Sequence, residues 1–286
     1  MFSKLLAYGK KSGTVVKSNP IIFMTIFMEL ILTGLITTGF ILFISPRNIV
    51  QYGGSASQAG FPFIMLALMM VSYFLIAIAI QAGKLNMICR GVRSQEVTFN
   101  HFGEGVRAFF VRILGGAFLL ILLGGLLGII IVPIVLVMGI LGLIILTIGI
   151  IVVATLLIFW ETILVYDELP SAWDAITGSF KFVKKHFWMV LLLQILFTIS
   201  NSIIDKLGAT PSIEPLGILR DEGIVFFSSL GNVAGASMIS QVILLTVIAM
   251  LFKLFIETFY FVFYHNKGMS IGYQENDESE SQSEGE

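Results

Sequence analysis

The chain of 286 residues is 57% hydrophobic and only 12% charged, and its mean hydropathy is +0.96. A soluble domain averages about 25% charged residues, so this composition excludes an ordinary soluble helical domain, which would expose too much apolar surface. The formal net charge of −1 conceals an asymmetry, because the 13 residues Gln274–Glu286 carry six acids and no base. We therefore predict an all-α polytopic membrane protein with a disordered acidic cytoplasmic tail at 274–286.

The first predicted crossing follows a basic start. Residues 1–19 carry four lysines and no acid, and an apolar-rich stretch of 25 residues follows at 20–44. A signal-peptide core spans only about 7–15 residues, so we expect this stretch to be retained, with its amino end in the cytoplasm. A polar turn at Ser45–Gly60 leads to a second crossing at 61–83, and we predict a basic loop at 84–112 after it.

The longest uncharged run, Ile113–Trp160, spans 48 residues without Asp, Glu, Lys, Arg or His. As one helix it would be about 70 Å long at about 1.5 Å per residue. The hydrocarbon core is only about 30 Å thick, so the run predicts two crossings, at 112–132 and 137–165. Pro133 and the glycine region 139–142 are the predicted places for the turn between them.

The remaining predicted elements are a polar loop at 166–186, a crossing at 187–204, a long loop at 205–237 and a crossing at 238–264. Residues 1–273 would then form one domain of six crossings arranged as three hairpins. Thirteen of the 17 bases fall on the side of the two termini and three on the other side. The positive-inside rule therefore predicts a multi-pass protein of the inner or plasma membrane with both termini in the cytoplasm. Whether 223–237 re-enters the membrane stays open.

Two of the cytoplasmic segments share one pattern. Their apolar residues have the spacing 3, 4, 3, 4 and an offset of 74 residues: Phe99, Phe102, Val106, Phe109 and Ile113, and then Trp173, Ile176, Phe180, Val183 and Phe187. This spacing predicts amphipathic helices that lie in the headgroup layer. Asn100 is the predicted cap of the first helix, and Ser171 with Asp174 forms a capping-box pattern for the second. Residues 1–19, with Leu5, Tyr8 and Val15, are a weaker third copy.

Basic residues flank both stripes. The predicted lipid-surface contacts are Arg107, Arg112, Lys181, Lys184 and Lys185. A Lys or Arg near an anionic surface contributes about 1 kcal/mol of attraction, so membrane lipid with anionic headgroups is the expected partner. A protein partner is the alternative, and nucleic acid has no support because the positive-inside rule already explains these bases.

One motif in the second segment carries a resemblance to known families. It consists of Asp167–Glu168–Leu169–Pro170–Ser171–Ala172–Trp173–Asp174–Ala175, then Ser179–Phe180 and Val183–Lys184–Lys185–His186–Phe187–Trp188. This pattern resembles uncharacterised prokaryotic six-helix membrane families, namely YciC-like proteins and the membrane domain associated with some glycerophosphodiester phosphodiesterases. The resemblance implies a six-helix integral membrane fold and no established activity. The catalytic histidines and metal carboxylates of the soluble phosphodiesterase barrel have no counterpart in this sequence.

Few charged residues fall inside the predicted crossings, and such residues are costly enough to be functional candidates. They are Glu29, Glu161, Lys253 and Glu257. Glu29 and Lys253 have comparable predicted depths, so an ion pair between the first and sixth crossings would neutralise both. Glu161 and Glu257 lie close enough to predicted interfaces to reach water. Two interpretations stay open: a polar site for a proton, an ion or a lipid headgroup, and an ion pair that fixes helix packing.

The sequence contains no Gly-x-Ser-x-Gly, His-Glu-x-x-His or Cys-x-x-Cys motif, so we predict no catalytic residue, cofactor or metal site. The expected function is that of a non-enzymatic integral membrane protein whose cytoplasmic helices engage anionic lipid or a protein partner. The alternative is a transporter of a small solute, an ion or a lipid that uses Glu29, Lys253 and Glu257. A membrane-embedded enzyme ranks third.

Overall fold

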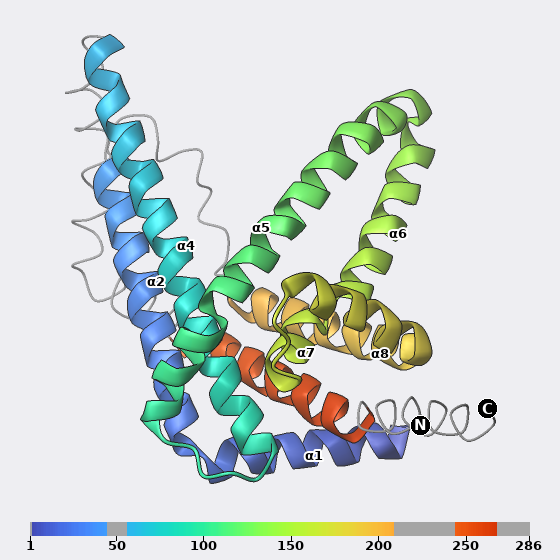
Figure 1. The fold of residues 1–286 in the computed structure, drawn as a ribbon. Coiled ribbons are helices and arrows are strands. Elements are labelled where there is room, and N and C mark those ends of the chain that lie inside the picture. Colours follow the sequence, from blue (N-terminus) through green and yellow to red (C-terminus); the bar gives the residue numbers. More distant parts are fainter. Residues whose placement is uncertain (1, 45–55, 209–243, 268–286) are drawn as a thin grey trace, which may run out of the picture. The chain divides into compact units, whose positions relative to one another are not determined.

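The computed structural model describes residues 2–44, 56–208 and 244–267, and the regular elements in these ranges are all helical (Figure 1). In chain order they are α1 (Phe2–Ser18), the short 3-10 helix η1 (Pro20–Ile22), α2 (Phe23–Ile44), α4 (Ala56–Val92), α5 (Phe99–Met138), α6 (Ile140–Leu157), α7 (Trp160–Tyr166), α8 (Ala172–Gly208) and a last helix, Leu244–Lys267. Within the described ranges no β-strand occurs, so the predicted all-α fold is confirmed.

The described helices include five that are long and apolar enough to cross a membrane, or six if the bent pair Ser3–Ser18 and Pro20–Ile36 counts as one span. The other spans are Ala67–Val92, Phe99–Ile129, Ile140–Tyr166, Ala172–Ser200 and Leu244–Lys267. Each of these overlaps one predicted crossing, because a run of about 20 apolar residues is the length that a membrane helix requires. By helix length and hydropathy, the protein is a multi-pass membrane protein.

The predicted basic segment at 84–112 is wrong in its first part, because 84–92 continue a helix, whereas the helix predicted over 99–113 is present. Helix α4 continues to Val92 and α5 begins at Phe99, so the connection is only about six residues long. Leu85, Ile88 and Val92 are buried along one side of α4, and their spacing of 3 and 4 residues is helical. The predicted cap was also wrong by two residues: Thr98 caps α5, and its backbone N–H donates a hydrogen bond to His101 Nδ1 at 3.0 Å.

The two helices α5 and α6 form the predicted hairpin, and Figure 1 shows them as two arms joined at one end. The turn is at Gly139, where φ is +58° and the amide donates to the carbonyl of Val135 at 2.9 Å. A Cβ on Gly142 would lie 2.8 Å from Val135 Cα, so the close approach of the two arms requires glycine there. Pro133 lies inside α5 instead of at the turn, since membrane helices tolerate proline.

The chain divides into two compact units, and the first comprises the described residues of Met1–Ile22, Gln81–Leu196 and Phe255–Glu286. Its core is an aromatic cluster contributed by the α6–α7 junction, α8 and the last helix. Phe159 lies at the centre, with ring centroids 5.0 Å from Phe182, 5.1 Å from Tyr260 and 5.7 Å from Phe263. Phe159 and Phe263 are fully buried. Aromatic packing of this kind ties together helices that are distant in sequence.

The amphipathic stripes face this core only in part. Ile176 and Val183 of α8 are buried, whereas Trp173 and Phe180 of the same stripe are 53% and 42% exposed. In α8 the backbone is non-helical at His186, with φ −120° and ψ 22°, which is where the sequence predicted the surface helix to end. No such break separates the two parts of α5, so the predicted amphipathic helix over 99–113 is the first part of one helix of 40 residues that runs from Phe99 to Met138.

The second unit comprises the described residues of Phe23–Ile80 and Phe197–Leu254. Phe197 of α8 and Phe252 of the last helix contact each other, with ring centroids 6.3 Å apart. The predicted loop at 205–237 begins later than expected, because α8 continues to Gly208. Residues 209–237 of that loop, residues 45–55 of the first turn and the acidic tail 274–286 lie outside the described residues.

Candidate functional site

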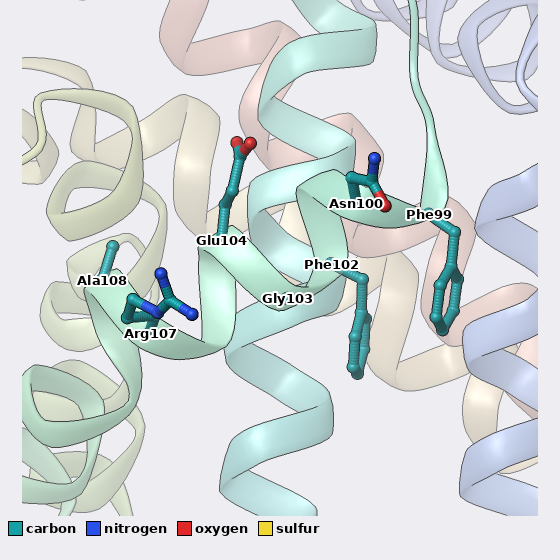
Figure 2. A pocket seen from close by; sticks show the side chains of 7 residues that line it. All are labelled: Phe99, Asn100, Phe102, Gly103, Glu104, Arg107 and Ala108. Atoms are coloured by element: carbon teal, nitrogen blue, oxygen red, sulfur yellow. The ribbon is translucent and has the colours of Figure 1, made fainter.

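An open groove of about 810 Å³ lies along the first turns of α5, in the first unit (Figure 2). Its lining comes from one stretch of that helix: Phe99, Asn100, Phe102, Gly103, Glu104, Arg107 and Ala108. The groove therefore lies just before the uncharged part of α5 that begins at Ile113. It combines an aromatic wall with one exposed cation, and each part has an identifiable structural cause.

The aromatic wall consists of Phe99 and Phe102. Their rings are stacked with centroids 5.5 Å apart and an interplanar angle of 8°, and Figure 2 shows both rings projecting from the same side of α5. Phe102 is held against α4, because a Cβ on Gly83 would lie only 2.3 Å from its ring. Phe99 is 42% exposed and extends the apolar surface outward. The absence of a side chain at Gly83 thus positions the wall.

The charge of the groove is positive. Glu104 extends to the opposite side of the helix from the two rings in Figure 2, and its carboxylate is 2.8 Å from Arg90 Nη2 of α4. Arg107 is exposed and forms no ion pair with any residue that the structure describes. The amino terminus of α5 adds a partial positive charge from its free N–H groups. An anion that enters this groove would therefore find a guanidinium beside an apolar surface.

The other predicted lipid contacts divide into two groups. Arg112 is half-buried, and its Nη1 donates hydrogen bonds to the carbonyls of Leu169 at 3.0 Å and Glu168 at 3.3 Å. It therefore fixes the connection between α7 and α8. Lys181, Lys184 and Lys185 are exposed on α8, as the amphipathic pattern predicts.

The connection between α7 and α8, which begins the motif described above, has a second anchor at Arg93. The guanidinium lies over the Tyr166 ring at 4.6 Å, donates a hydrogen bond to the Tyr166 carbonyl, and is 3.6 Å from Glu168 Oε1. Stacking and a charged hydrogen bond together suit arginine and not lysine. No pattern in the sequence indicates this role, because Arg93 is one of many bases that the positive-inside rule already explains.

A third anchor comes from the last helix. Tyr264 donates a hydrogen bond of 2.6 Å to Asp167 Oδ2, and the hydroxyl of Tyr166 is 2.7 Å from His265 Nδ1. Partial desolvation raises the pKa of the Asp167 carboxyl above its ordinary value, although the Tyr264 hydrogen bond and the charge of Arg93 act in the opposite direction. These contacts hold the motif residues to α4, to α5 and to the last helix, which is a structural role for the motif.

A buried polar cluster lies inside the membrane-spanning part of the first unit. Lys84 is only 2% exposed, and its Nζ is 2.9 Å from Glu257 Oε2 and 3.0 Å from Oε1. Gln81 Nε2 donates to Glu161 Oε2 at 2.9 Å and to Glu257 Oε1 at 3.4 Å. Glu161 and Glu257 were predicted to reach interfacial water, but the structure brings both to Gln81 instead.

The sequence did not identify Lys84 as a member of this cluster, because it was assigned to a loop. The helical spacing of Leu85, Ile88 and Val92 was the signal that α4 continues and places Lys84 on a helix. A buried lysine charge costs several kcal/mol of desolvation unless an acid compensates it. The pairing with Glu257 therefore explains why both residues are tolerated at this depth.

In the second unit the structure brings Glu29 and Lys253 together, as their predicted depth indicated. Lys253 Nζ is 3.7 Å from Glu29 Oε2, with Lys253 54% exposed and Glu29 17% exposed. The pair joins α2 and the last helix across a long sequence separation. Among the described residues, no group of three or more His, Cys, Asp and Glu side chains is arranged to hold a metal ion.

Comparison with known proteins adds no identification. No family model matches this chain, and neither a curated protein nor a solved structure matches it. The candidate site is therefore assigned from its chemistry alone.

Proposed function

We propose that this multi-pass membrane protein is non-enzymatic and binds anionic lipid headgroups at the groove on α5. The observation that carries the proposal is Arg107, an exposed guanidinium without an ion pair to any described residue, beside the stacked rings of Phe99 and Phe102. A guanidinium forms bidentate hydrogen bonds with phosphate, and the rings offer an apolar surface to the adjacent part of the lipid.

The position of the groove along α5 supports this assignment. After Arg112 the helix carries no charged residue up to Met138, so the groove lies at the boundary between charged and apolar sequence. Headgroup phosphates occupy this level of a membrane. Lys181, Lys184 and Lys185 of α8 are exposed and extend the same basic character. We assign this side of the protein to the cytoplasm because thirteen of the 17 bases belong to it in the predicted topology.

The proposal is tested by lipid binding in neutral detergent. The purified chain is titrated with phosphatidylglycerol and, separately, with phosphatidylcholine, and bound lipid is counted by native mass spectrometry. Arg107→Gln should weaken phosphatidylglycerol binding about fivefold, because one base contributes about 1 kcal/mol and 1.4 kcal/mol is tenfold. Arg107→Lys should retain most of the binding, and phosphatidylcholine binding should not change.

Lys17→Gln is the matched control, because Lys17 is an exposed base on α1 outside the groove and its substitution removes the same charge. Equal losses in the Arg107 and Lys17 variants would show a general charge effect and would refute a specific groove. Charge reversal at Arg107 and at Lys181 extends the test. If neither Arg107→Glu nor Lys181→Glu changes lipid binding, these helices do not dock on anionic lipid and the proposal is refuted.

Transport of a small solute, an ion or a lipid through Glu29, Lys253 and Glu257 has weaker support. Each of these side chains lies within ion-pair distance of an opposite charge, Glu29 with Lys253 and Glu257 with Lys84. This arrangement favours the interpretation in which the intramembrane charges fix helix packing. The resemblance to six-helix membrane families is consistent with either function and stays a prediction.

A further inference from the structure

The polar side of the groove on α5 is a stripe of three side chains. Asn100, Glu104 and Arg107 are spaced by 4 and 3 residues, which places them along one side of the helix, and all three are exposed. Together they present an amide, a carboxylate and a guanidinium. A phosphate needs only the guanidinium, so the other two groups indicate a ligand with further polar atoms.

The carboxylate of this stripe is held by Arg90 of α4. Arg90 Nη2 donates a hydrogen bond to Glu104 Oε2 at 2.8 Å. Opposite charges three residues apart attract each other on a helix, so Glu104 without this contact would be drawn to Arg107. The contact with Arg90 therefore leaves the Arg107 guanidinium to a ligand. It also compensates the charge of Glu104 without using all of its acceptor positions, because a carboxylate has about four lone-pair sites.

Asn100 is not required to begin the helix. Thr98 caps α5 together with His101, so the Asn100 amide belongs to the exposed stripe instead. Gly103 lies between Asn100 and Arg107 in the sequence and is exposed, and a Cβ added to it would lie in open space. The stripe thus has an open floor of backbone on which a ligand can lie between the two side chains.

The order of the groups along α5 matches the order of a phospholipid headgroup. Arg107 is nearest to the uncharged run that begins at Ile113, and Glu104 lies about 4.5 Å further from that run at about 1.5 Å per residue. Asn100 follows one turn beyond Glu104. In a phospholipid the phosphate is next to the acyl chains and the headgroup alcohol extends outward from it. A phosphate on Arg107 would therefore place the alcohol beside Glu104 and Asn100.

The charges of the stripe favour a hydroxyl headgroup over an ammonium headgroup. Arg90 and Arg107 contribute +2 and Glu104 contributes −1, so these three side chains sum to +1. One phosphodiester balances that sum. An ammonium on the same headgroup would be repelled by two guanidiniums. A hydroxyl has no charge, and it can donate to a carboxylate and accept from an amide.

We infer that the groove on α5 recognises an anionic lipid whose headgroup carries hydroxyl groups, as in phosphatidylglycerol, and that Asn100 and Glu104 determine this preference. The Arg107 guanidinium binds the phosphate, the Glu104 carboxylate accepts a hydrogen bond from one hydroxyl, and the Asn100 amide binds the other. The inference rests on the proposed lipid binding and deepens it, because it names the chemistry of the headgroup.

Phosphatidylmethanol provides the matched comparison, because it has the phosphodiester and the charge of phosphatidylglycerol but no headgroup hydroxyl. Each lipid, with identical acyl chains, is titrated into the purified full chain in neutral detergent, and bound lipid is counted by native mass spectrometry. Phosphatidylglycerol should bind about fivefold more tightly, which corresponds to about 1 kcal/mol, the net contribution of a typical hydrogen bond. Phosphatidylserine, which has the same net charge but an ammonium, should bind no more tightly than phosphatidylmethanol.

Two variants assign the preference to the stripe. Asn100→Ala should lower the ratio between the two lipids to about twofold and leave phosphatidylmethanol binding unchanged, because it removes one of two hydroxyl contacts. Glu104→Ala should lower the ratio as well but strengthen phosphatidylmethanol binding, because it releases Arg90 from its ion pair. Glu96→Ala is the matched control, since Glu96 is an exposed acid outside the groove lining and its substitution should not change the ratio.

The inference is overturned if the unmodified chain binds both lipids equally, if phosphatidylserine binds as tightly as phosphatidylglycerol, or if both stripe variants keep the original ratio. It is also overturned if free glycerol phosphate displaces the lipid at equal concentration, because the ligand would then be a soluble phosphate ester. Arg107→Gln separates the two proposals. Weaker binding of both lipids in this variant supports the proposed function whatever the ratio is, and unchanged binding of both refutes it.

Discussion

The buried ion pair between Lys84 and Glu257 makes the sharpest prediction about stability. Both carboxylate oxygens of Glu257 lie within 3.0 Å of Lys84 Nζ, and the two side chains are only 12% and 2% exposed. Removal of one partner leaves an uncompensated buried charge, which costs about 3–5 kcal/mol in buried pairs. Lys84→Met and Glu257→Gln should therefore each lower the free energy of unfolding by about that amount.

The double variant Lys84→Met/Glu257→Gln should recover most of this loss, since neither member of the pair is then left as a buried charge without its partner. The non-additivity, obtained from the two single variants and the double variant, should be at least about 2 kcal/mol. A natural control is an exposed pair that joins the same helix α4 to α5. Arg90 and Glu104 are separated by 2.8 Å but are 35% and 56% exposed, and exposed pairs couple by only about 0–1 kcal/mol.

The assay is equilibrium unfolding by urea in neutral detergent, followed by tryptophan fluorescence. The cycle for Lys84 and Glu257 is measured beside the cycle for Arg90→Met and Glu104→Gln. Because the two pairs have similar distances, a difference in coupling reports burial. If the buried pair couples no more strongly than the exposed pair, the explanation of the Lys84 position by charge compensation is wrong.

The remaining predictions concern packing and the loop after α7. Gly83→Ala should destabilise the protein by about 1–3 kcal/mol, because its Cβ would lie 2.3 Å from the Phe102 ring, whereas Gly13→Ala, with open space around it, should stabilise α1 by about 0.5–1 kcal/mol. Thermal unfolding of the two variants in one detergent compares them, and equal effects would contradict the close approach at Gly83. Tyr264→Phe removes the hydrogen bond to Asp167 and should cost about 1.5–3 kcal/mol. Hydrogen exchange should then rise in 166–171 and stay constant in the α5–α6 hairpin, and an unchanged rate at 166–171 would show that the bond does not restrain this loop.

The sequence predicted the transmembrane segments well because burial in lipid acts on a whole stretch of chain. A run of about 20 apolar residues specifies a membrane helix whatever its neighbours are. Patterns within a contiguous stretch of chain also predicted the break of α8 at His186 and the turn of the hairpin in the glycine region. These patterns failed at Pro133, where proline continues a helix, and at 84–92, where α4 continues beyond the predicted end of the second crossing at 83.

The pairing of Glu29 with Lys253 was predictable, because equal depth in a membrane restricts which residues can meet. The cluster around Lys84 was not, since its members come from α4, α7 and the last helix and no spacing in the sequence relates them. The sequence also could not predict which side of an amphipathic helix is covered by other helices of the protein. Trp173 and Ile176 belong to one stripe, yet one is exposed and the other is buried.

The sequence by itself thus determined that this is a helical multi-pass membrane protein and where most of its helices run, because hydropathy and helical periodicity are properties of contiguous chain. Only the tertiary structure decided which charges are compensated and which are available to a ligand. Charge compensation depends on distances between side chains that are far apart in sequence, such as Arg90 with Glu104 and Lys84 with Glu257. Those pairings leave Arg107 as the exposed guanidinium of the groove on α5.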